Sequence, residues 1–255
     1  MVFAIDIGNS SITAGVVDVT GVLFVERIST AHARTDLEYA MALKAALDLH
    51  GLDAADILGC IISSVAPEMT GILSLAAEKV TGQAPLIVGP GIRTGLNIRI
   101  DHPAQLGSDL VVSAVAAVAE YPLPLILIDM GTATTFSAIG PGGEYLGGSI
   151  VPGPQVSLDS LVSTASQLPR ISLTPPKRAI GRNTVDCMRS GSFYGNAALI
   201  DGMITCLSEE LGDPACVVAT GTPIRAFLPY CRHEILYDET MPLKGLYQIF
   251  RRNVR

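Results

Sequence analysis

Two short stretches, half a chain apart, each deliver one aspartate from an apolar run into a turn of small residues. The first stretch, Ala4–Gly15, carries Asp6, and the second, Leu125–Phe136, carries Asp129. In both, one apolar residue and a glycine follow the aspartate, and the chain then turns back. Backbone N–H groups in such a turn can surround a phosphate, while the carboxylate binds a hard cation such as Mg²⁺. The pattern therefore predicts phosphate and metal binding.

A single turn of this kind has a simpler interpretation. It could be a hairpin whose aspartate only hydrogen-bonds its own turn. Two copies of one design favour an internal duplication instead. We therefore expect two related halves, residues 1–121 and 122–255, joined near Tyr121–Pro124, where two prolines end a helix.

The composition of the chain restricts its class. A chain of 255 residues with 49% hydrophobic and 16% charged residues can bury one large core or two modest ones. A net charge of -7 without a basic run argues against nucleic acid and anionic membrane as partners. The five cysteines lack metal-ligand spacing, which fits a reducing cytoplasm. Without a long apolar run, neither membrane insertion nor secretion is expected.

The elements that must position the two aspartates alternate between strands and helices, which is typical of the α/β class. In the first half we expect these strands and helices: Val2–Ile7, Val22–Arg27, Asp36–His50, Ile57–Ser64, Met69–Thr81 and Ala84–Val88. Thr35 or Asp36 would cap the first helix. Its apolar face would be Leu37, Ala40, Met41, Leu43, Ala46 and Leu47.

The second half repeats this alternation. After the aspartate hairpin we expect a strand with a glycine-rich turn (Glu144–Pro154), a helix (Ser157–Ser166) and a loop (Gln167–Arg182). A long helix capped by Asn183 or Thr184 would then run to Leu211, followed by a strand into a turn (Ala215–Thr222) and a terminal helix (Leu243–Arg252). Glycines within the long helix suggest close helix packing, which could be between subunits.

A third carboxylate, Asp109, lies at the start of a helix that follows a long loop, residues 89–108. Such loops are commonly functional. One interpretation makes Asp109 an acid that complements the helix dipole, with Ser108 as the cap. The other makes Asp109 a general base for a hydroxyl group, if a cleft lies beside it. The local sequence leaves both open.

Taken together, the motifs resemble the type III pantothenate kinases, members of the actin, sugar-kinase and heat-shock-protein-70 ATPase superfamily. The matching stretches are Asp6–Ser10, Ser63–Pro67, Gly89–Gly91 with Thr94–Asn97, Leu106–Asp109, Asp129–Thr135, Gly147–Gly148 with Pro152–Gly153, and Gly181–Thr184. Each is weak alone, but their order and spacing are specific. The resemblance implies duplicated ribonuclease-H-like domains with a cleft between the halves, and a homodimer in the cytoplasm.

The resemblance also implies ATP-dependent phosphorylation of pantothenate, the first step toward coenzyme A. By motif, the phosphate and Mg²⁺ loop would be Asp6, Gly8, Asn9, Ser10, Ser11, Ile12 and Thr13. Asp109 would be the base, Thr132 a nucleotide contact, and Asp129 the ligand of a monovalent cation, K⁺ or NH4⁺. The substrate side would comprise Ile100, Gly107, Ser108, Asp109, Leu110 and Thr184.

Four positions depart from the family pattern. Leu110 replaces an arginine, Ile100 a tyrosine, Ser137 an aspartate and Thr222 a glycine. Leucine cannot donate a hydrogen bond to the carboxylate of pantothenate as arginine would. Two alternatives to a pantothenate kinase therefore stay open. One is a kinase for another small hydroxyl compound, and the other is a weakened regulatory or binding paralogue.

Overall fold

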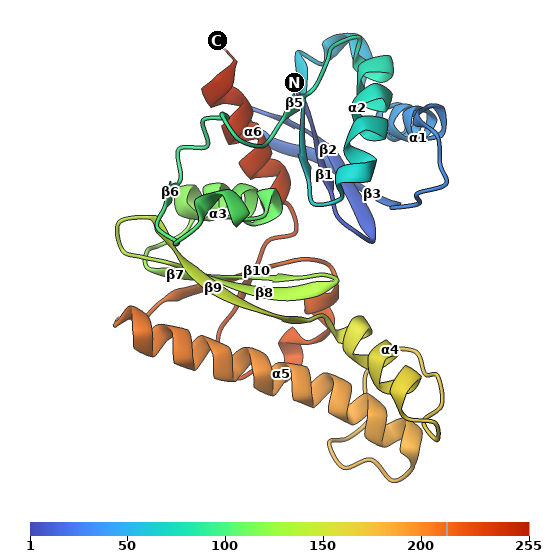
Figure 1. Ribbon diagram of the computed structural model, residues 1–255, viewed down its shortest axis with the longest axis vertical. Helices are drawn as coiled ribbons and strands as arrows, with labels where there is room; N and C mark the ends of the chain where they lie inside the picture. The colour runs from blue at the N-terminus through green and yellow to red at the C-terminus, as the bar shows by residue number, and fades with distance from the viewer. Residues whose placement is uncertain (213, 255) are drawn as a thin grey trace. The chain divides into compact units, whose positions relative to one another are not determined.

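The computed structural model describes residues 1–212 and 214–254, which form two compact units (Figure 1). Among these residues, unit 1 comprises 1–97, 101–120 and 240–254, and unit 2 comprises 98–100, 121–212 and 214–239. The boundary between Glu120 and Tyr121 lies one residue before the expected one. The C-terminal residues differ from the expected division, because they pack in unit 1.

Unit 1 contains a five-stranded sheet in the order β3-β2-β1-β4-β5. The strands are β1 (Val2–Ile7), β2 (Ser11–Asp18), β3 (Gly21–Ser29), β4 (Gly59–Ser64) and β5 (Leu86–Ile87). The first three run antiparallel, and β4 and β5 run parallel to β1. Because β1 is central and covered on both faces, its residues other than Asp6 are buried, as the continuous apolar run predicts.

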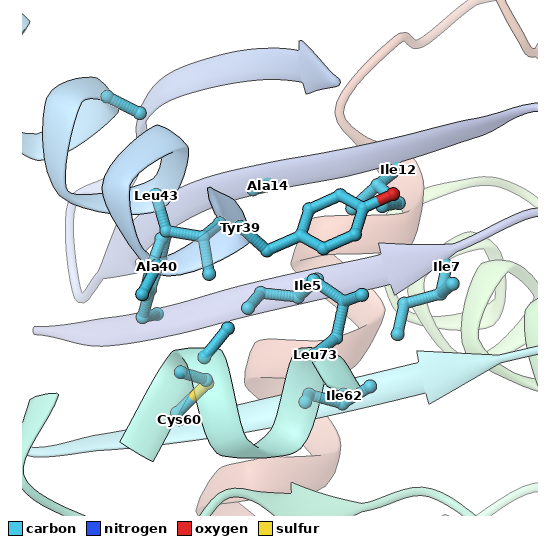
Figure 2. Close-up of a cluster of buried hydrophobic side chains, with 14 of the residues drawn as sticks. Ile5, Ile7, Ile12, Ala14, Tyr39, Ala40, Leu43, Cys60, Ile62 and Leu73 are labelled. Carbon is cyan, nitrogen blue, oxygen red and sulfur yellow. The ribbon is translucent and has the colours of Figure 1, made fainter. Parts of the chain in front are cut away.

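Helices α1 (Asp36–Leu49) and α2 (Pro67–Thr81) cover one face of this sheet (Figure 2). Thr35 caps α1 in a reciprocal capping box with Glu38. The buried face of α1 consists of Tyr39, Ala40, Leu43, Ala46 and Leu47. The expected face was wrong at two positions, since Leu37 is 58% exposed and Met41 65% exposed. Tyr39 takes their place in the core.

The C-terminal helix α6 (Met241–Asn253) packs on β1, β2 and β4 and on α3 (Ser108–Glu120). Three glycines permit this close approach. A Cβ atom on Gly15 would lie 2.6 Å from Leu243 Cδ1, one on Gly59 would overlap the Phe250 ring, and one on Gly245 would overlap the Val112 carbonyl oxygen. This packing is the reason that the C-terminal residues belong to unit 1.

Unit 2 contains a sheet in the order β11-β10-β7-β8-β9-β6. The strands are β6 (Asn97–Ile98), β7 (Leu125–Met130), β8 (Ala133–Ile139), β9 (Glu144–Pro152), β10 (Cys216–Thr220) and β11 (Leu236–Tyr237). Strands β7, β8 and β9 are antiparallel, and β10 and β11 run parallel to β7. Taken in the direction β9-β8-β7-β10-β11, five of these strands repeat the order and directions of β3-β2-β1-β4-β5 in unit 1. This repeat confirms the predicted duplication.

Two helices of unit 2 follow β9: α4 (Pro154–Thr164) and α5 (Thr184–Leu211). Helix α4 begins earlier than expected because a proline occupies its first turn. Helix α5 packs Phe193, Ile200 and Ile204 against the apolar side chains of β7. Asn183, rather than Thr184, caps α5 by accepting a hydrogen bond from the N–H of Asp186.

Within the described residues, no helix is both long enough and apolar enough to span a membrane.

Candidate active site

In unit 1, Asp6 lies at the end of β1, directly before an exposed turn. Ile7 pairs with Ile12 in the hairpin, so Gly8–Ser11 forms the turn. The N–H of Gly8 donates to the carbonyl oxygen of Ser11 over 3.0 Å. The side chains at positions 9, 10 and 11 are exposed. The turn therefore offers small polar residues to a ligand, as the sequence predicts.

A brace from the end of β3 holds this turn. The Thr30 hydroxyl donates to the carbonyl oxygen of Gly8 over 2.8 Å, and the Thr30 N–H donates to that of Ser10 over 3.1 Å. The buried Tyr39 hydroxyl accepts from the N–H of Ala31 at 2.8 Å. Nothing in the local sequence around Thr30 indicates this brace, because its partners Gly8 and Ser10 lie about twenty residues earlier in the chain. A hydroxyl-bearing aromatic on the buried face of α1 was the available signal.

The strand beside Asp6 carries a cluster of hydroxyl groups. Asp6 lies opposite the buried Ser63 of β4 in the parallel register. The Ser63 hydroxyl donates to Ser108 Oγ over 3.0 Å, and Ser108 also bonds the backbone of Ser64. One of the two interpretations of Asp109 made Ser108 the cap of α3, but Ser108 is the first residue of that helix and its hydroxyl bonds β4 instead.

Asp109 follows Ser108 and is partly buried. Its Oδ1 accepts from the N–H of Leu110 over 2.8 Å. A Cβ atom on Gly107 would overlap that same oxygen, so glycine leaves room for the carboxylate. Burial raises the pKa of Asp109 above the ordinary aspartate value, and the backbone N–H groups oppose the rise. A carboxylate with a raised pKa suits proton transfer near neutral pH.

The other expected substrate residues belong to different parts of the chain. Leu110 is half-buried in the first turn of α3 in unit 1. Ile100 is half-buried in unit 2, where its Cγ2 lies 3.9 Å from the position of a Cβ atom on Gly147. Thr184 is exposed as the first residue of α5 in unit 2.

The hairpin of unit 2 places Asp129 near the end of β7, and Met130 pairs with Thr134. The N–H of Gly131 donates to the carbonyl oxygen of Ala133 over 2.8 Å, and Thr132 is exposed. The N–H of Gly153 donates to the carbonyl oxygen of Thr132 over 2.9 Å. A Cβ atom on Gly153 would overlap the Gly131 carbonyl oxygen, so close glycine contact braces this turn.

Gly221 lies against Asp129. It follows Thr220, which pairs with Asp129 in the parallel register. Its φ is +86°, and a Cβ atom there would lie 3.0 Å from Asp129 Oδ1 and overlap the Met130 carbonyl oxygen. Ser137, one of the four positions that depart from the resembled pattern, is buried, and its hydroxyl hydrogen-bonds the Tyr145 hydroxyl over 3.0 Å. The Tyr145 hydroxyl thus gives a hydrogen-bond partner to Ser137, the serine that stands in place of an aspartate.

The chemistry of Asp6 and its turn fits a phosphate group with Mg²⁺. Among the described residues, no group of three His, Cys, Asp or Glu side chains could enclose a metal ion. Mg²⁺ in phosphate-transferring proteins is usually held by one or two carboxylates together with substrate phosphates. Asp6 beside the exposed Gly8–Ser11 turn matches that donor set.

The two sheets with shared strand order define the duplicated fold of the actin, sugar-kinase and heat-shock-protein-70 ATPases. Solved structures with this fold include a putative Baf family transcriptional activator from Campylobacter jejuni (TM-score 0.61, 18% identity, 98% of each chain covered). Another is the activator of the 2-hydroxyisocaproyl-CoA dehydratase from Clostridium difficile with bound ADPNP (TM-score 0.56, 12% identity, 99% of this chain and 93% of that chain). At these identities they show the fold alone.

Sequence comparison is more specific. The profile of the type III pantothenate kinases matches residues 2–206. The type III pantothenate kinase of Moorella thermoacetica is 39% identical over 253 residues, which cover 99% of this chain and 100% of the relative. The protein belongs to the type III pantothenate kinase family.

Proposed function

We propose that this protein transfers the γ-phosphate of ATP to the terminal hydroxyl of pantothenate, which forms 4′-phosphopantothenate in the first step of coenzyme A biosynthesis. Membership in the family along the whole chain supports this activity. The observation that carries it is the placement of Asp109, a partly buried carboxyl group with a raised pKa. Ser108 ties its helix to the strand beside Asp6.

Unit 1 would bind the phosphates. The segment proposed for this role is Gly8, Asn9, Ser10, Ser11, Ile12 and Thr13, with Thr30 as its brace. Asp6 would hold Mg²⁺, which when bound neutralises the charge on the phosphate oxygens. Phosphoryl transfer demands mainly alignment and charge stabilisation, so a rigid turn beside a carboxylate is an adequate scaffold.

Asp109 would accept the proton of the pantothenate hydroxyl as that oxygen attacks phosphorus. Its raised pKa brings the base closer to a neutral working pH than an exposed aspartate would be. By motif, the residues proposed for the substrate side are Gly107, Ser108 and Leu110 in unit 1, and Ile100 and Thr184 in unit 2. Leu110 and Ile100 would give apolar contacts where the family has polar ones.

Unit 2 would supply the remaining nucleotide and cation contacts. We assign Thr132 to the nucleotide, because it is exposed at the tip of the braced turn. We assign Asp129 to a monovalent cation, K⁺ or NH4⁺. The close packing of Gly221 limits the space around this carboxylate.

We assign the protein to the cytoplasm, where ATP is available, and its active form to a homodimer. Helix α5 carries Gly191, Gly195 and Gly202, and a Cβ atom on any of them would meet no other atom within 4 Å. Tyr194 on the same helix is 38% exposed, and Leu161 on α4 is 47% exposed. A second copy would cover these surfaces. Light scattering coupled to gel filtration tests this, and a monomer at the concentrations of the kinetic assay would contradict it.

The function itself is tested by measuring ATP-dependent formation of 4′-phosphopantothenate by mass spectrometry, with and without K⁺. The proposal predicts turnover that requires both ATP and pantothenate. If another vitamin or hydroxy acid is phosphorylated faster, the protein is a kinase for a different acceptor. If calorimetry detects neither ATP nor pantothenate binding to the folded protein, it is a regulatory paralogue.

A further inference from the structure

The hydroxyl group of Ser108 uses its full hydrogen-bonding capacity across two elements of unit 1. It donates to the carbonyl oxygen of Ser64 over 2.9 Å. It accepts from the Ser63 hydroxyl over 3.0 Å and from the N–H of Ser64 over 3.1 Å. One donor and two acceptor sites are all that a serine hydroxyl has. The start of α3 is therefore fastened to the end of β4 by one side chain.

This fastening joins two carboxylates of the proposed active site. Ser63, one end of the network, pairs with Asp6 across the parallel strands. Ser108, the other end, directly precedes Asp109. The end of β4 is itself held by α2, because the Thr70 hydroxyl donates to Ser64 Oγ over 2.8 Å. Asp6 and Asp109 are thus linked by a short path: the strand pairing of Asp6 with Ser63, the hydrogen bond from Ser63 to Ser108, and the peptide bond from Ser108 to Asp109.

The hydrogen bond of Asp109 itself cannot supply this link. Its Oδ1 accepts from the N–H of Leu110, which lies in the same helical turn and moves with it. That bond fixes the carboxylate relative to α3. Only a contact that leaves the helix can fix α3 relative to the sheet at this end. The Ser108 hydroxyl makes such a contact.

We propose that Ser108 is a positioning residue for phosphoryl transfer, which holds Asp109 at a set distance from the phosphate turn and Asp6. The proposal rests on the proposed role of Asp109 as the base. This positioning role needs no contact between the Ser108 hydroxyl and a substrate, because that hydroxyl already makes three hydrogen bonds to β4. The alternative is that Ser108 only stabilises the fold, in which case its loss would lower the melting temperature without changing catalysis.

Three variants separate these outcomes in the full-length protein. Ser108→Ala removes the network, Ser108→Thr keeps a hydroxyl, and Ser113→Ala is the matched control. Ser113 lies on the same helix, and its buried hydroxyl makes no hydrogen bond within the described structure. We expect Ser108→Ala to lower kcat at least tenfold with the KM for ATP within twofold, because misplaced groups lose rate more than binding. Ser108→Thr should recover most of kcat, and Ser113→Ala should match the wild type.

A readout that needs no turnover keeps this test independent of the activity. The ¹³C resonance of the Asp109 carboxyl group, identified by its absence in Asp109→Asn, reports on its surroundings. It should shift in Ser108→Ala and stay unchanged in Ser113→Ala. An unshifted resonance in folded Ser108→Ala, or unchanged kcat in that variant, overturns the positioning role.

If Ser108→Ala does not fold, Ser63→Ala removes one bond of the network and must shift the resonance in its place. Failure of the wild type to phosphorylate pantothenate would contradict the function, while the resonance still decides the position of Asp109.

Discussion

The two aspartate hairpins share one scaffold but differ in the turn that follows the carboxylate. In unit 1, Ile7 pairs with Ile12 and leaves the four residues Gly8–Ser11 in the turn. In unit 2, Met130 pairs with Thr134 and leaves the three residues Gly131–Ala133. The longer turn offers one more backbone N–H group and one more small side chain, which suits a group with several oxygens such as a triphosphate.

The braces of the two turns differ as well. A hydroxyl group, that of Thr30, holds the turn of unit 1 through the carbonyl oxygen of Gly8. Close backbone contact of Gly153 and Gly221 surrounds the turn and the aspartate of unit 2. A duplicated scaffold can therefore keep one carboxylate in place while neighbouring residues adapt each copy to a different ligand.

The largest expected effect concerns a carboxylate found beside the hairpin of unit 1. Asp109→Asn should lower kcat by roughly 10²–10⁴-fold, the usual contribution of a general base. Stability at neutral pH should be unchanged or higher, because the raised pKa means that ionisation of Asp109 opposes folding. Parallel kinetics and thermal melts check this.

The pH dependence gives the control. As the pH falls through the raised pKa, the wild-type carboxyl group becomes neutral, so the wild type should gain stability relative to Asp109→Asn. A large loss of stability in the variant at neutral pH would instead support Asp109 as a helix-terminal residue only.

A substitution in the glycine brace of unit 2 should mainly affect stability. Gly221→Ala combines a left-handed backbone with overlap against the Met130 carbonyl oxygen, and should cost roughly 2–5 kcal/mol. Gly82→Ala is the control, since Gly82 has φ +71° but open space around it, and should cost about 1–2 kcal/mol. Equal costs in urea unfolding would show that the contact with Asp129 and Met130 is unimportant.

The smallest effect is expected for the hydroxyl brace of unit 1. Thr30→Val removes the hydrogen bond to Gly8 with little change in shape, and should cost about 1 kcal/mol of stability. The KM for ATP should rise several-fold because the phosphate turn loosens. Thr81→Val removes a hydroxyl bond at the end of α2 and should leave that KM unchanged. The same KM in both variants would mean that the turn needs no brace.

The sequence predicted most of the strands and helices because their apolar periodicity is strong. It also predicted the duplication, since the two aspartate turns are local patterns. It did not predict the course of the C-terminal helix into unit 1, because Gly15, Gly59 and Gly245 meet their partners only in three dimensions. The role of Ser108 was hidden for a similar reason. A serine before an acid at a helix start is typical of a helix cap. The actual partners of Ser108 on β4, Ser64 and Ser63, lie 44 and 45 residues earlier in the chain.

The most direct test of the difference between the two hairpins is a cation titration of the wild type, Asp6→Asn and Asp129→Asn. Initial rates of phosphopantothenate formation are measured against Mg²⁺ at saturating K⁺, and against K⁺ at saturating Mg²⁺. We expect a crossed pattern. Asp6→Asn should raise the Mg²⁺ requirement alone, and Asp129→Asn should raise the K⁺ requirement alone. If both variants shift the requirement for the same cation, the two hairpins do not have the separate roles assigned to them.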